Sequence, residues 1–205
     1  MIDKLNLENA VSILKTGGLV AFPTDTLYAL GASSSIESAL ERVYEAKGRP
    51  IGMPLPILVS SPSDIHRVAI EIPEVTWRLI DAFWPGPLTI ILNKNKDISD
   101  IITAGGDTVG IRMPNHTIAL ALIQALGSPI TGTSANSSGD NSPSTAEDVF
   151  ESLGKSVDLI IDGGKCIASG ASTILDLASN EPKIVRHGVL SLEEIQRVEP
   201  TLARF

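Results

Sequence analysis

Lysine and arginine side chains near glycines are candidate anion-binding groups in two segments of the chain. Lys47 and Arg49 flank Gly48, directly before a proline, and Arg186 lies two residues before Gly188. Two cations on either side of a glycine form a compact fork that suits phosphate oxygens, which accept several charge-assisted hydrogen bonds. A helix predicted to end near this lysine offers a second explanation, because cations stabilise a helix C-terminus. The spacing indicates an anion site and leaves the structural explanation open.

One arginine occurs inside an apolar segment. Arg112 interrupts residues 109–113, which otherwise have the pattern of a buried strand. A buried guanidinium is costly unless a negative group neutralises it. A ligand carboxylate and a buried acidic side chain are both candidates, and we favour the ligand.

Hydroxyl side chains are concentrated in loops that follow predicted strands. Residues 23–28 contain two threonines and Asp25, a set that could hold a zwitterionic ligand or equally form a capped turn. Residues 103–108 are small and polar, residues 131–138 are rich in hydroxyls, and Ser172 and Thr173 add another pair. A flexible linker can have the same composition, so the combination of these loops is the signal.

The common nucleotide and metal motifs are absent. Gly164 and Lys165 are followed by Cys166, and Leu159 stands where a P-loop requires its first glycine. The chain has no Gly-x-Gly-x-x-Gly, no His-Glu-x-x-His and no pair of cysteines, which argues against a dinucleotide fingerprint and a protein-held zinc. Surface or ordinary structural positions are expected for the remaining reactive types, His66, His116, His187 and Cys166.

The acidic composition limits the class of ligand. The chain has 24 acidic and 16 basic residues and a formal net charge of −8. Proteins that bind RNA or DNA usually carry a basic excess, because neutralising phosphates drives binding. A small phosphate-bearing ligand at a local cluster of cations fits this charge better than a polynucleotide.

Cysteine usage and hydropathy indicate the compartment. The single cysteine, Cys166, excludes an internal disulfide, which suits a reducing environment. The first residues lack the apolar core of a signal peptide, and no apolar run approaches the roughly 18 residues of a membrane span. We therefore expect a cytoplasmic protein.

Hydrophobic periodicity predicts the elements that position these loops. Apolar residues recur every three or four positions in predicted helices over residues 7–15, 35–46, 72–83, 118–126, 145–153 and from 191. Short apolar and β-branched runs predict strands over residues 18–22, 55–59, 88–92, 109–113, 129–131, 157–161, 173–177 and 183–185. Asn6 is the predicted cap of the first helix. No linker or repeat divides residues 1–205, so we expect one α/β domain with a mixed sheet.

Taken in order, these segments resemble the YrdC/Sua5 family of L-threonylcarbamoyladenylate synthases. The resemblance covers nearly the whole chain, and the ordered set of motifs is specific although each motif alone is weak. The matching segments are residues 23–31 (PTDTLYALG), Lys47 with Arg49, residues 84–89 (WPGPLT), residues 103–114, Ser134 with Asn136, residues 161–173, and Arg186 with Gly188.

The resemblance implies a twisted, open, mixed α/β sheet with helices packed on it and a concave, positively charged crevice. It implies an enzyme that condenses L-threonine, bicarbonate or CO₂, and ATP, with Mg²⁺, to threonylcarbamoyl-AMP and pyrophosphate. That product supplies the t⁶A modification beside the anticodon of tRNA. By the same resemblance, separate tRNA threonylcarbamoyltransferase proteins complete the transfer. Little direct tRNA binding is therefore expected, in agreement with the acidic composition.

The resemblance also assigns site residues at the matching positions. Lys47 and Arg49 are the candidates for neutralising charge as pyrophosphate leaves, and no side chain is expected as a metal ligand. The ATP side is expected to comprise Lys47, Arg49, Thr108, Ser134, Asn136, Ser142 and Arg186. The L-threonine side is expected to comprise Thr24, Tyr28, Arg112, Gly132 and Ser172.

The chain departs from the family pattern at a few positions. Asp25 stands where the family usually has glutamate, and Ala29 replaces the usual glycine. Met53 lies close to the expected nucleotide site and is left outside it. The sequence also lacks the additional C-terminal domain of the long form, so the short, single-domain form is expected.

Two other functions stay open. A related enzyme on the same fold could use a different carbamoyl acceptor, as the carbamoyl-adenylate-forming module of hydrogenase maturation does. Lys47 with Arg49, Ser134 with Asn136, and the absence of acylphosphatase-like and zinc-finger segments favour the synthase. A non-enzymatic RNA-binding or ribosome-maturation protein is the third hypothesis, and the net charge of −8 disfavours it.

Overall fold

Two mixed β-sheets form the framework, where the sequence predicted one mixed sheet. The computed structural model describes residues 3–167, 170–179 and 181–202. The four-stranded sheet has the order β7 (Thr133–Ser134), β2 (Tyr28–Gly31), β1 (Val20–Pro23) and β8 (Leu159–Ile160). The six-stranded sheet has the order β10 (Lys183–Arg186), β9 (Thr173–Asp176), β4 (Leu88–Asn93), β5 (Thr108–Arg112), β3 (Ile57–Leu58) and β6 (Ile130–Thr131). Parallel and antiparallel pairs occur in both sheets, so the predicted mixed α/β class is confirmed.

The chain passes from one sheet to the other at Gly132, which alone separates β6 from β7. A Cβ at this position would lie 2.3 Å from Cγ of Leu58, so only glycine fits the crossing without moving that side chain. The sheets also meet at an isolated antiparallel bridge between Ser33 and Ile130. The split between the sheets therefore falls within the segment that the sequence analysis treated as one strand and its following loop.

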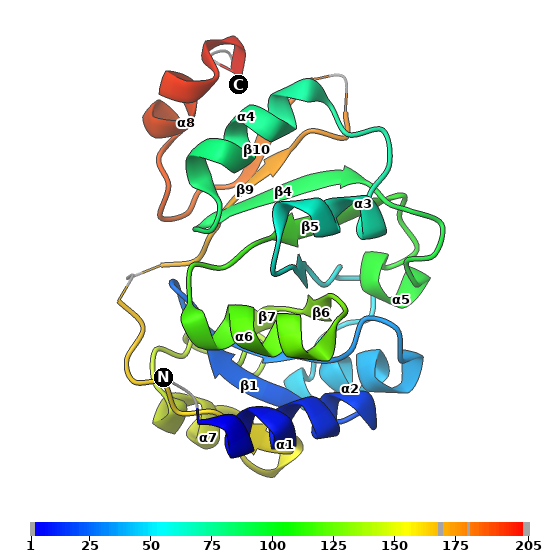
Figure 1. Cartoon of the computed structure of the whole chain (residues 1–205), viewed down its shortest axis with the longest axis vertical. Coiled ribbons are helices and arrows are strands. Elements are labelled where there is room, and N and C mark those ends of the chain that lie inside the picture. The colour runs from blue at the N-terminus through cyan, green and yellow to red at the C-terminus, as the bar shows by residue number, and fades with distance from the viewer. Residues whose placement is uncertain (1–2, 168–169, 180, 203–205) are drawn as a thin grey trace.

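Helices cover both sheets. They are α1 (Lys4–Lys15), α2 (Glu37–Lys47), α3 (Ile65–Val68), α4 (Glu74–Phe83), α5 (Asp100–Thr103), α6 (Thr117–Leu126), α7 (Ala146–Leu153) and α8 (Leu192–Val198), with 3₁₀ turns at Pro62–Asp64, Gly154–Ser156 and Pro200–Leu202. Figure 1 shows α4 and α8 beside the six-stranded sheet and α1 and α7 beside β1 at the other end of the molecule. In the described residues, no helix has the length and hydropathy needed to cross a membrane.

The alternation of side chains along β1 divides the core around the four-stranded sheet. Successive side chains of a strand point to opposite faces. Val20 and Phe22 therefore pack in the cluster that contains residues of α1 and α6. Ala21 packs in the cluster that contains residues of α2 and α7. A third cluster joins the six-stranded sheet to α3, α4, α5 and α8.

Most predicted helices and strands are confirmed, with local differences. The first helix begins at Lys4, and its cap is Asp3 instead of the predicted Asn6, because Asp3 Oδ1 accepts a hydrogen bond from the Asn6 backbone N–H at 2.9 Å. The strand β2 was missed, because the sequence analysis assigned residues 23–28 to a loop and predicted no strand after it; all four residues of β2 are buried. The predicted pairing of β9 with β10 is confirmed as antiparallel.

Gly188→Ala is expected to destabilise the protein by about 1–3 kcal/mol, the usual cost of overpacking. An ideal Cβ there would lie 2.4 Å from backbone atoms of Ala171, Ser172 and Thr173, which cannot move singly. Urea unfolding measures the change. Gly52→Ala is the control, because its Cβ meets nothing within 4 Å, and it is expected to be neutral or stabilising. Equal stability of the two variants would contradict the expectation.

Candidate active site

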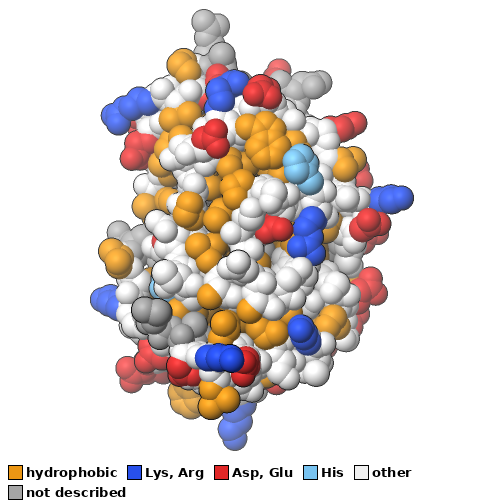
Figure 2. All heavy atoms as spheres, viewed as in Figure 1, with side chains coloured by type: hydrophobic (Ala, Val, Ile, Leu, Met, Phe, Trp, Pro, Cys, Tyr) orange, Lys and Arg blue, Asp and Glu red, His pale blue; other side chains and the backbone are white. Residues whose placement is uncertain are grey.

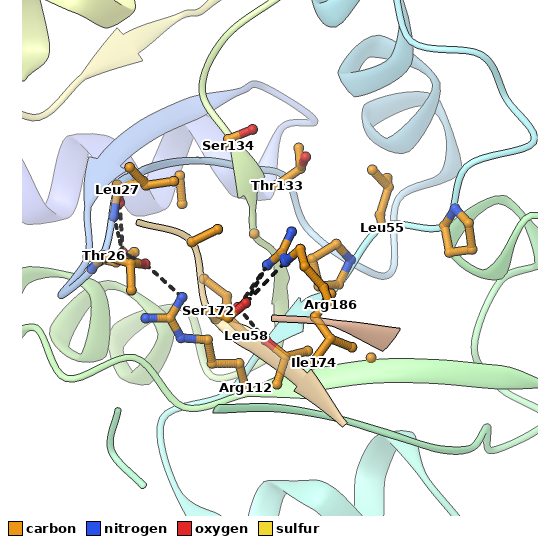
Figure 3. Close-up of a pocket in the computed structure, with 18 of the residues that line it drawn as sticks. Thr26, Leu27, Leu55, Leu58, Arg112, Thr133, Ser134, Ser172, Ile174 and Arg186 are labelled. Atoms are coloured by element: carbon orange, nitrogen blue, oxygen red, sulfur yellow. Dashed lines mark hydrogen bonds between the residues drawn. The ribbon is translucent and has the colours of Figure 1, made fainter. Parts of the chain in front are cut away.

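A pocket of about 280 Å³ lies between the two sheets (Figure 3). The volume is close to the lower end of the range of about 300–1,000 Å³ that is typical of small-molecule sites. The β1–β2 turn, β2 and β7 line one side, and β4, β5, β9 and β10 line the other. All but two of the predicted site residues line it: Thr24, Tyr28, Arg49, Thr108, Arg112, Gly132, Ser134, Ser142, Ser172 and Arg186.

The β1–β2 turn lines the pocket and is also a capped turn. The Thr24 hydroxyl donates to the Leu27 carbonyl at 2.7 Å and accepts from the backbone N–H groups of Thr26 and Leu27 at 3.1 and 3.2 Å. The sequence analysis weighed a ligand site and a capped turn equally at this position. The structure forms the turn, and the Thr24 hydroxyl is committed to it.

Arg112 is buried in β5, with 7% of its surface exposed. Nη2 donates to Asp25 Oδ1 at 2.6 Å, Nη1 donates to the Thr26 hydroxyl at 2.8 Å, and Nε donates to the Gly86 carbonyl at 3.0 Å. The favoured prediction of a ligand as the counter-ion is therefore corrected, because Asp25, from the neighbouring sheet, reaches the guanidinium. A guanidinium has five N–H groups, so two remain for a ligand.

Arg186 reaches the same pocket from β10. Its Nε and Nη2 donate to the Ser172 carbonyl at 3.1 and 2.9 Å, and Nη2 also contacts the Ser172 hydroxyl at 3.0 Å. The Ser172 hydroxyl lies 2.8 Å from that of Thr89. Figure 3 shows the Arg112 and Arg186 guanidinium groups on either side of Ser172.

Arg49 supplies a third guanidinium to the lining. Nη2 donates to the Pro54 carbonyl at 2.9 Å, and Nε donates to the Met53 carbonyl at 3.3 Å. Met53 itself is outside the lining, and its side chain is exposed. The hydrogen bonds to residues 53 and 54 hold Arg49 at the pocket wall.

The pocket carries an excess of positive charge. Burial lowers the pKa of Arg112, the Asp25 carboxylate opposes this shift, and repulsion from Arg186 adds to it. Burial also lowers the pKa of Arg49 and of Arg186. In the described part of the chain, neither Arg49 nor Arg186 forms an ion pair, and no carboxylate lines the pocket. The arrangement favours an anion.

Several hydroxyls face the pocket without a partner. Among the described residues, the side chains of Thr108, Ser134 and Ser142 form no hydrogen bond with the protein, although all three line the pocket. Hydroxyl groups can donate and accept hydrogen bonds. These three therefore offer both functions to a ligand, unlike the hydroxyls of Thr24 and Ser172, which are engaged.

Lys47 and Asn136 are the two predicted site residues that do not line the pocket. Lys47 Nζ donates to the carbonyl oxygens of Ser134 and Asn136, each at 2.5 Å. The geometry therefore does not support the prediction that Lys47 and Arg49 bind one anion together. The reason is that α2 ends against the loop after β7, so the lysine reaches that loop first.

Tyr28 is among the residues of the pocket lining, but its side chain is buried in the core and its hydroxyl points to another loop. The hydroxyl donates to the Gly164 carbonyl at 2.8 Å and accepts from the Gly163 backbone N–H at 3.1 Å. Tyr28 thus ties β2 to the segment after β8. None of the other reactive types, His66, His116, His187 and Cys166, lines the pocket.

The sequence analysis missed part of the lining. Thr26 and Thr89 lie within the quoted motifs, so a closer reading of those segments could have found them. The apolar part of the lining includes Leu55, Leu58 and Ile91. Apolar strand residues of this kind have the same pattern whether they face a core or a cavity, so no local signal separates the two.

The comparisons with known proteins agree with this fold. The Sua5/YciO/YrdC family model, described as telomere recombination, matches residues 12–188. The chain is 44% identical over 197 residues to a threonylcarbamoyl-AMP synthase of Pyrococcus abyssi, covering 96% of this chain and 58% of that protein. It is 41% identical over 193 residues to a threonylcarbamoyl-AMP synthase of Bacillus subtilis, covering 94% of this chain and 56% of that protein. The chain thus spans little more than half the length of these relatives.

Solved structures match as well. The structure of P. abyssi Sua5 complexed with L-threonine has a TM-score of 0.95 at 44% identity, covering 97% of this chain and 58% of that one. The structure of Escherichia coli YciO has a TM-score of 0.86 at 31% identity, covering 95% of both chains. These matches and the family model extend over nearly all of the sequence, and the chain therefore belongs to the Sua5/YciO/YrdC family.

Proposed function

We propose that the chain binds L-threonine and ATP in this pocket and, with bicarbonate or CO₂, forms threonylcarbamoyl-AMP and pyrophosphate. The observation that carries the proposal is that the described residues line the pocket with three guanidinium groups and with hydroxyls that they leave unbonded, but with no carboxylate. Such a pocket suits ligands that carry carboxylate and phosphate groups. The names of the relatives and the threonine complex of the P. abyssi protein support the same reading.

The proposed threonine site is built around Arg112. Its two remaining N–H groups would bind the amino-acid carboxylate as a bidentate pair, the geometry for which arginine is best suited. Asp25 and Thr26 hold the guanidinium in place through one N–H group on each terminal nitrogen. The hydroxyls of Thr24 and Ser172 already form hydrogen bonds within the protein. They would shape the wall of the threonine site and accept hydrogen bonds from the ligand through their remaining lone pairs.

The proposed ATP site comprises the other two arginines and the free hydroxyls. Arg49 and Arg186 would neutralise phosphate charge, and Thr108, Ser134 and Ser142 would bind phosphate or ribose oxygens. Mg²⁺ would enter on the phosphates, since the described residues contain no group of three or more His, Cys, Asp or Glu that could hold a metal. Magnesium is commonly bound in this way, through substrate phosphates and water.

The chemistry needs no protein nucleophile. The neutral threonine amine attacks CO₂, forming the N–C bond, and loses one proton to solvent to give a carbamate. A carbamate oxygen then attacks the α-phosphorus of ATP. A new P–O bond forms as the bond to the bridging oxygen breaks, and pyrophosphate leaves with that bonding pair. The protein contributes alignment and electrostatic stabilisation of the leaving group, which the pocket cations can supply.

Delivery of the product to tRNA is assigned in this proposal to separate threonylcarbamoyltransferase proteins. The net charge of −8 disfavours binding of a polyanion. On the face that Figure 2 shows, the described basic side chains are interspersed with acidic ones and do not form one patch. A small product that dissociates or is handed over fits this surface.

The proposal predicts that pyrophosphate release requires L-threonine, bicarbonate and ATP together. Each substrate contributes atoms to the product, so omission of any one should reduce the rate to background. A coupled pyrophosphate assay with single omissions measures this. Release that proceeds equally without threonine would overturn the proposal, as would acceptance of unrelated amines at the same rate.

Arg112→Lys is expected to raise the KM for threonine by about 10- to 100-fold, because a charged hydrogen bond contributes about 1.5–3 kcal/mol and lysine cannot bind a carboxylate bidentately. The KM for ATP should change much less. Arg42→Lys is the matched control, since Arg42 also pairs with an aspartate, Asp158, at 2.9 Å but is outside the pocket lining. Equal threonine KM values in both variants would contradict the assignment.

A further inference from the structure

Lys47 buries its ammonium group without a carboxylate partner. The residue is 2% exposed, and in the part of the chain that the structure describes it forms no ion pair. Its acceptors are the carbonyl oxygens of Ser134 and Asn136, each 2.5 Å from Nζ, and Oδ1 of Asn136 at 3.5 Å. A buried charge without a counter-ion is costly, so core packing alone does not explain a lysine here.

The loop that Lys47 holds, residues 134–142, meets the pocket at both ends. Ser134 and Ser142 line the pocket, and their hydroxyls form no hydrogen bond with described residues. The loop is tied to α2 twice, by the ammonium group and by the Ser138 backbone N–H, which donates to the Lys47 carbonyl at 2.8 Å. The direction of the free hydroxyls therefore depends on the end of α2.

We propose that Lys47 is a positioning residue, which binds the carbonyl oxygens of Ser134 and Asn136 and thereby directs the Ser134 and Ser142 hydroxyls toward the nucleotide. Lys47 itself does not touch the substrate. The inference rests on the proposed function, because ATP is the anion that these hydroxyls would bind. It differs from the expectation of the sequence analysis, in which Lys47 contacted the phosphates.

The electrostatics support this assignment. A carbonyl oxygen carries partial negative charge, and uncompensated carbonyls at Ser134, in the pocket wall, and at Asn136, close behind it, would repel phosphate oxygens. The ammonium group compensates them and leaves positive charge behind the wall that carries Ser134. Figure 3 shows Ser134 and Thr133 on the opposite side of the pocket from Arg112, so this wall is separate from the proposed carboxylate site.

Lys47→Met is the first test, because methionine keeps most of the length and removes the charge. We expect kcat/KM for ATP to fall by about 100-fold, the usual effect of misplacing a binding group by about 1 Å, while the KM for threonine changes by no more than about twofold. Lys15→Met is the matched control, since Lys15 also ends a helix but is exposed. An unchanged kcat/KM in Lys47→Met would overturn the inference.

A double-mutant cycle separates positioning from direct contact. If Lys47 acts through Ser134, adding Ser134→Ala to Lys47→Met should cost no more than about twofold further, because coupled residues are not additive. If Lys47 contacts the phosphates itself, the two effects should multiply. If the losses of kcat/KM in the two single variants multiply in the double variant, the inference is contradicted, whereas the proposed function still holds.

Hydrogen exchange gives a readout that needs no activity. Lys47→Met should speed amide exchange in residues 134–142 and leave exchange in β4 and β5 unchanged, because the loop loses the contacts from Nζ, while its hydrogen bonds to Ser152, to the backbone carbonyl of residue 47 and within itself remain. Equal protection of the loop in both proteins would refute the inference. An inactive wild-type enzyme with a loosened loop in Lys47→Met would instead count against the proposed function alone.

Burial of Lys47 also predicts a dependence of stability on pH. Burial lowers the pKa of Lys47 from 10.5 to about 8, with a smaller effect from repulsion by Arg49. The loop packed against it, residues 134–138, has no charged side chain, and Asp140 farther along is exposed. Between about pH 8 and 10.5 the unfolded state therefore binds more protons than the folded state. The contribution of Lys47 to the free energy of unfolding is fully present above pH 10.5 and is lost as the pH falls through about 8.

The free energy of unfolding should thus rise with pH over this range in wild type relative to Lys47→Met. The equilibrium constant for unfolding should change by up to about tenfold per pH unit, the limit for one proton. Urea unfolding at a series of pH values measures it, and the other titrating groups cancel because both proteins share them. Parallel curves would show that the ammonium is not buried as described.

Discussion

The ion pair between Arg112 and Asp25 is the contact on which the pocket depends. It joins β5 of the six-stranded sheet to the β1–β2 turn of the four-stranded sheet, with 2.6 Å between Nη2 and Oδ1. The same guanidinium binds Thr26 and Gly86, and Asp25 also accepts the backbone N–H of Asn115 at 3.0 Å. Removing one partner of a buried pair typically costs about 3–5 kcal/mol. This contact therefore joins the two walls of the pocket directly, from β5 to the β1–β2 turn.

The local elements could be predicted because they depend on residues that are near neighbours in the chain. The cations and hydroxyls of the pocket were also found, since glycines and strand ends mark them. Their individual partners were not. Asp25 lies 87 residues before Arg112, and Asn136 lies 89 residues after Lys47. A single sequence holds no signal for such pairs, so it could not show that Asp25 neutralises Arg112 or that Lys47 faces a loop.

The distribution of charge explains how an acidic molecule can attract a small anion. The chain as a whole carries a formal charge of −8, which opposes a polyanion that would cover much of its surface. Among the described residues, the pocket lining holds three guanidinium groups and no carboxylate, and only Arg112 of the three is paired with an acid, Asp25. Low-dielectric walls strengthen the field of these charges. Burial acts against each of these charges, as the lowered pKa values of Arg49, Arg112 and Arg186 indicate. A bound anion would relieve that cost.

The crossing at Gly132 has a consequence for how this chain can vary over evolutionary time. One residue carries the backbone from β6 to β7, with Leu58 directly against it. Leu58 and Ile130 of the six-stranded sheet also pack in one buried cluster with Val20 and Phe22 of the four-stranded sheet. Substitutions at this seam therefore require adjustment in both sheets, because residues in contact do not act independently. A larger residue at 132 would require a smaller one at 58, so these two positions are expected to change together.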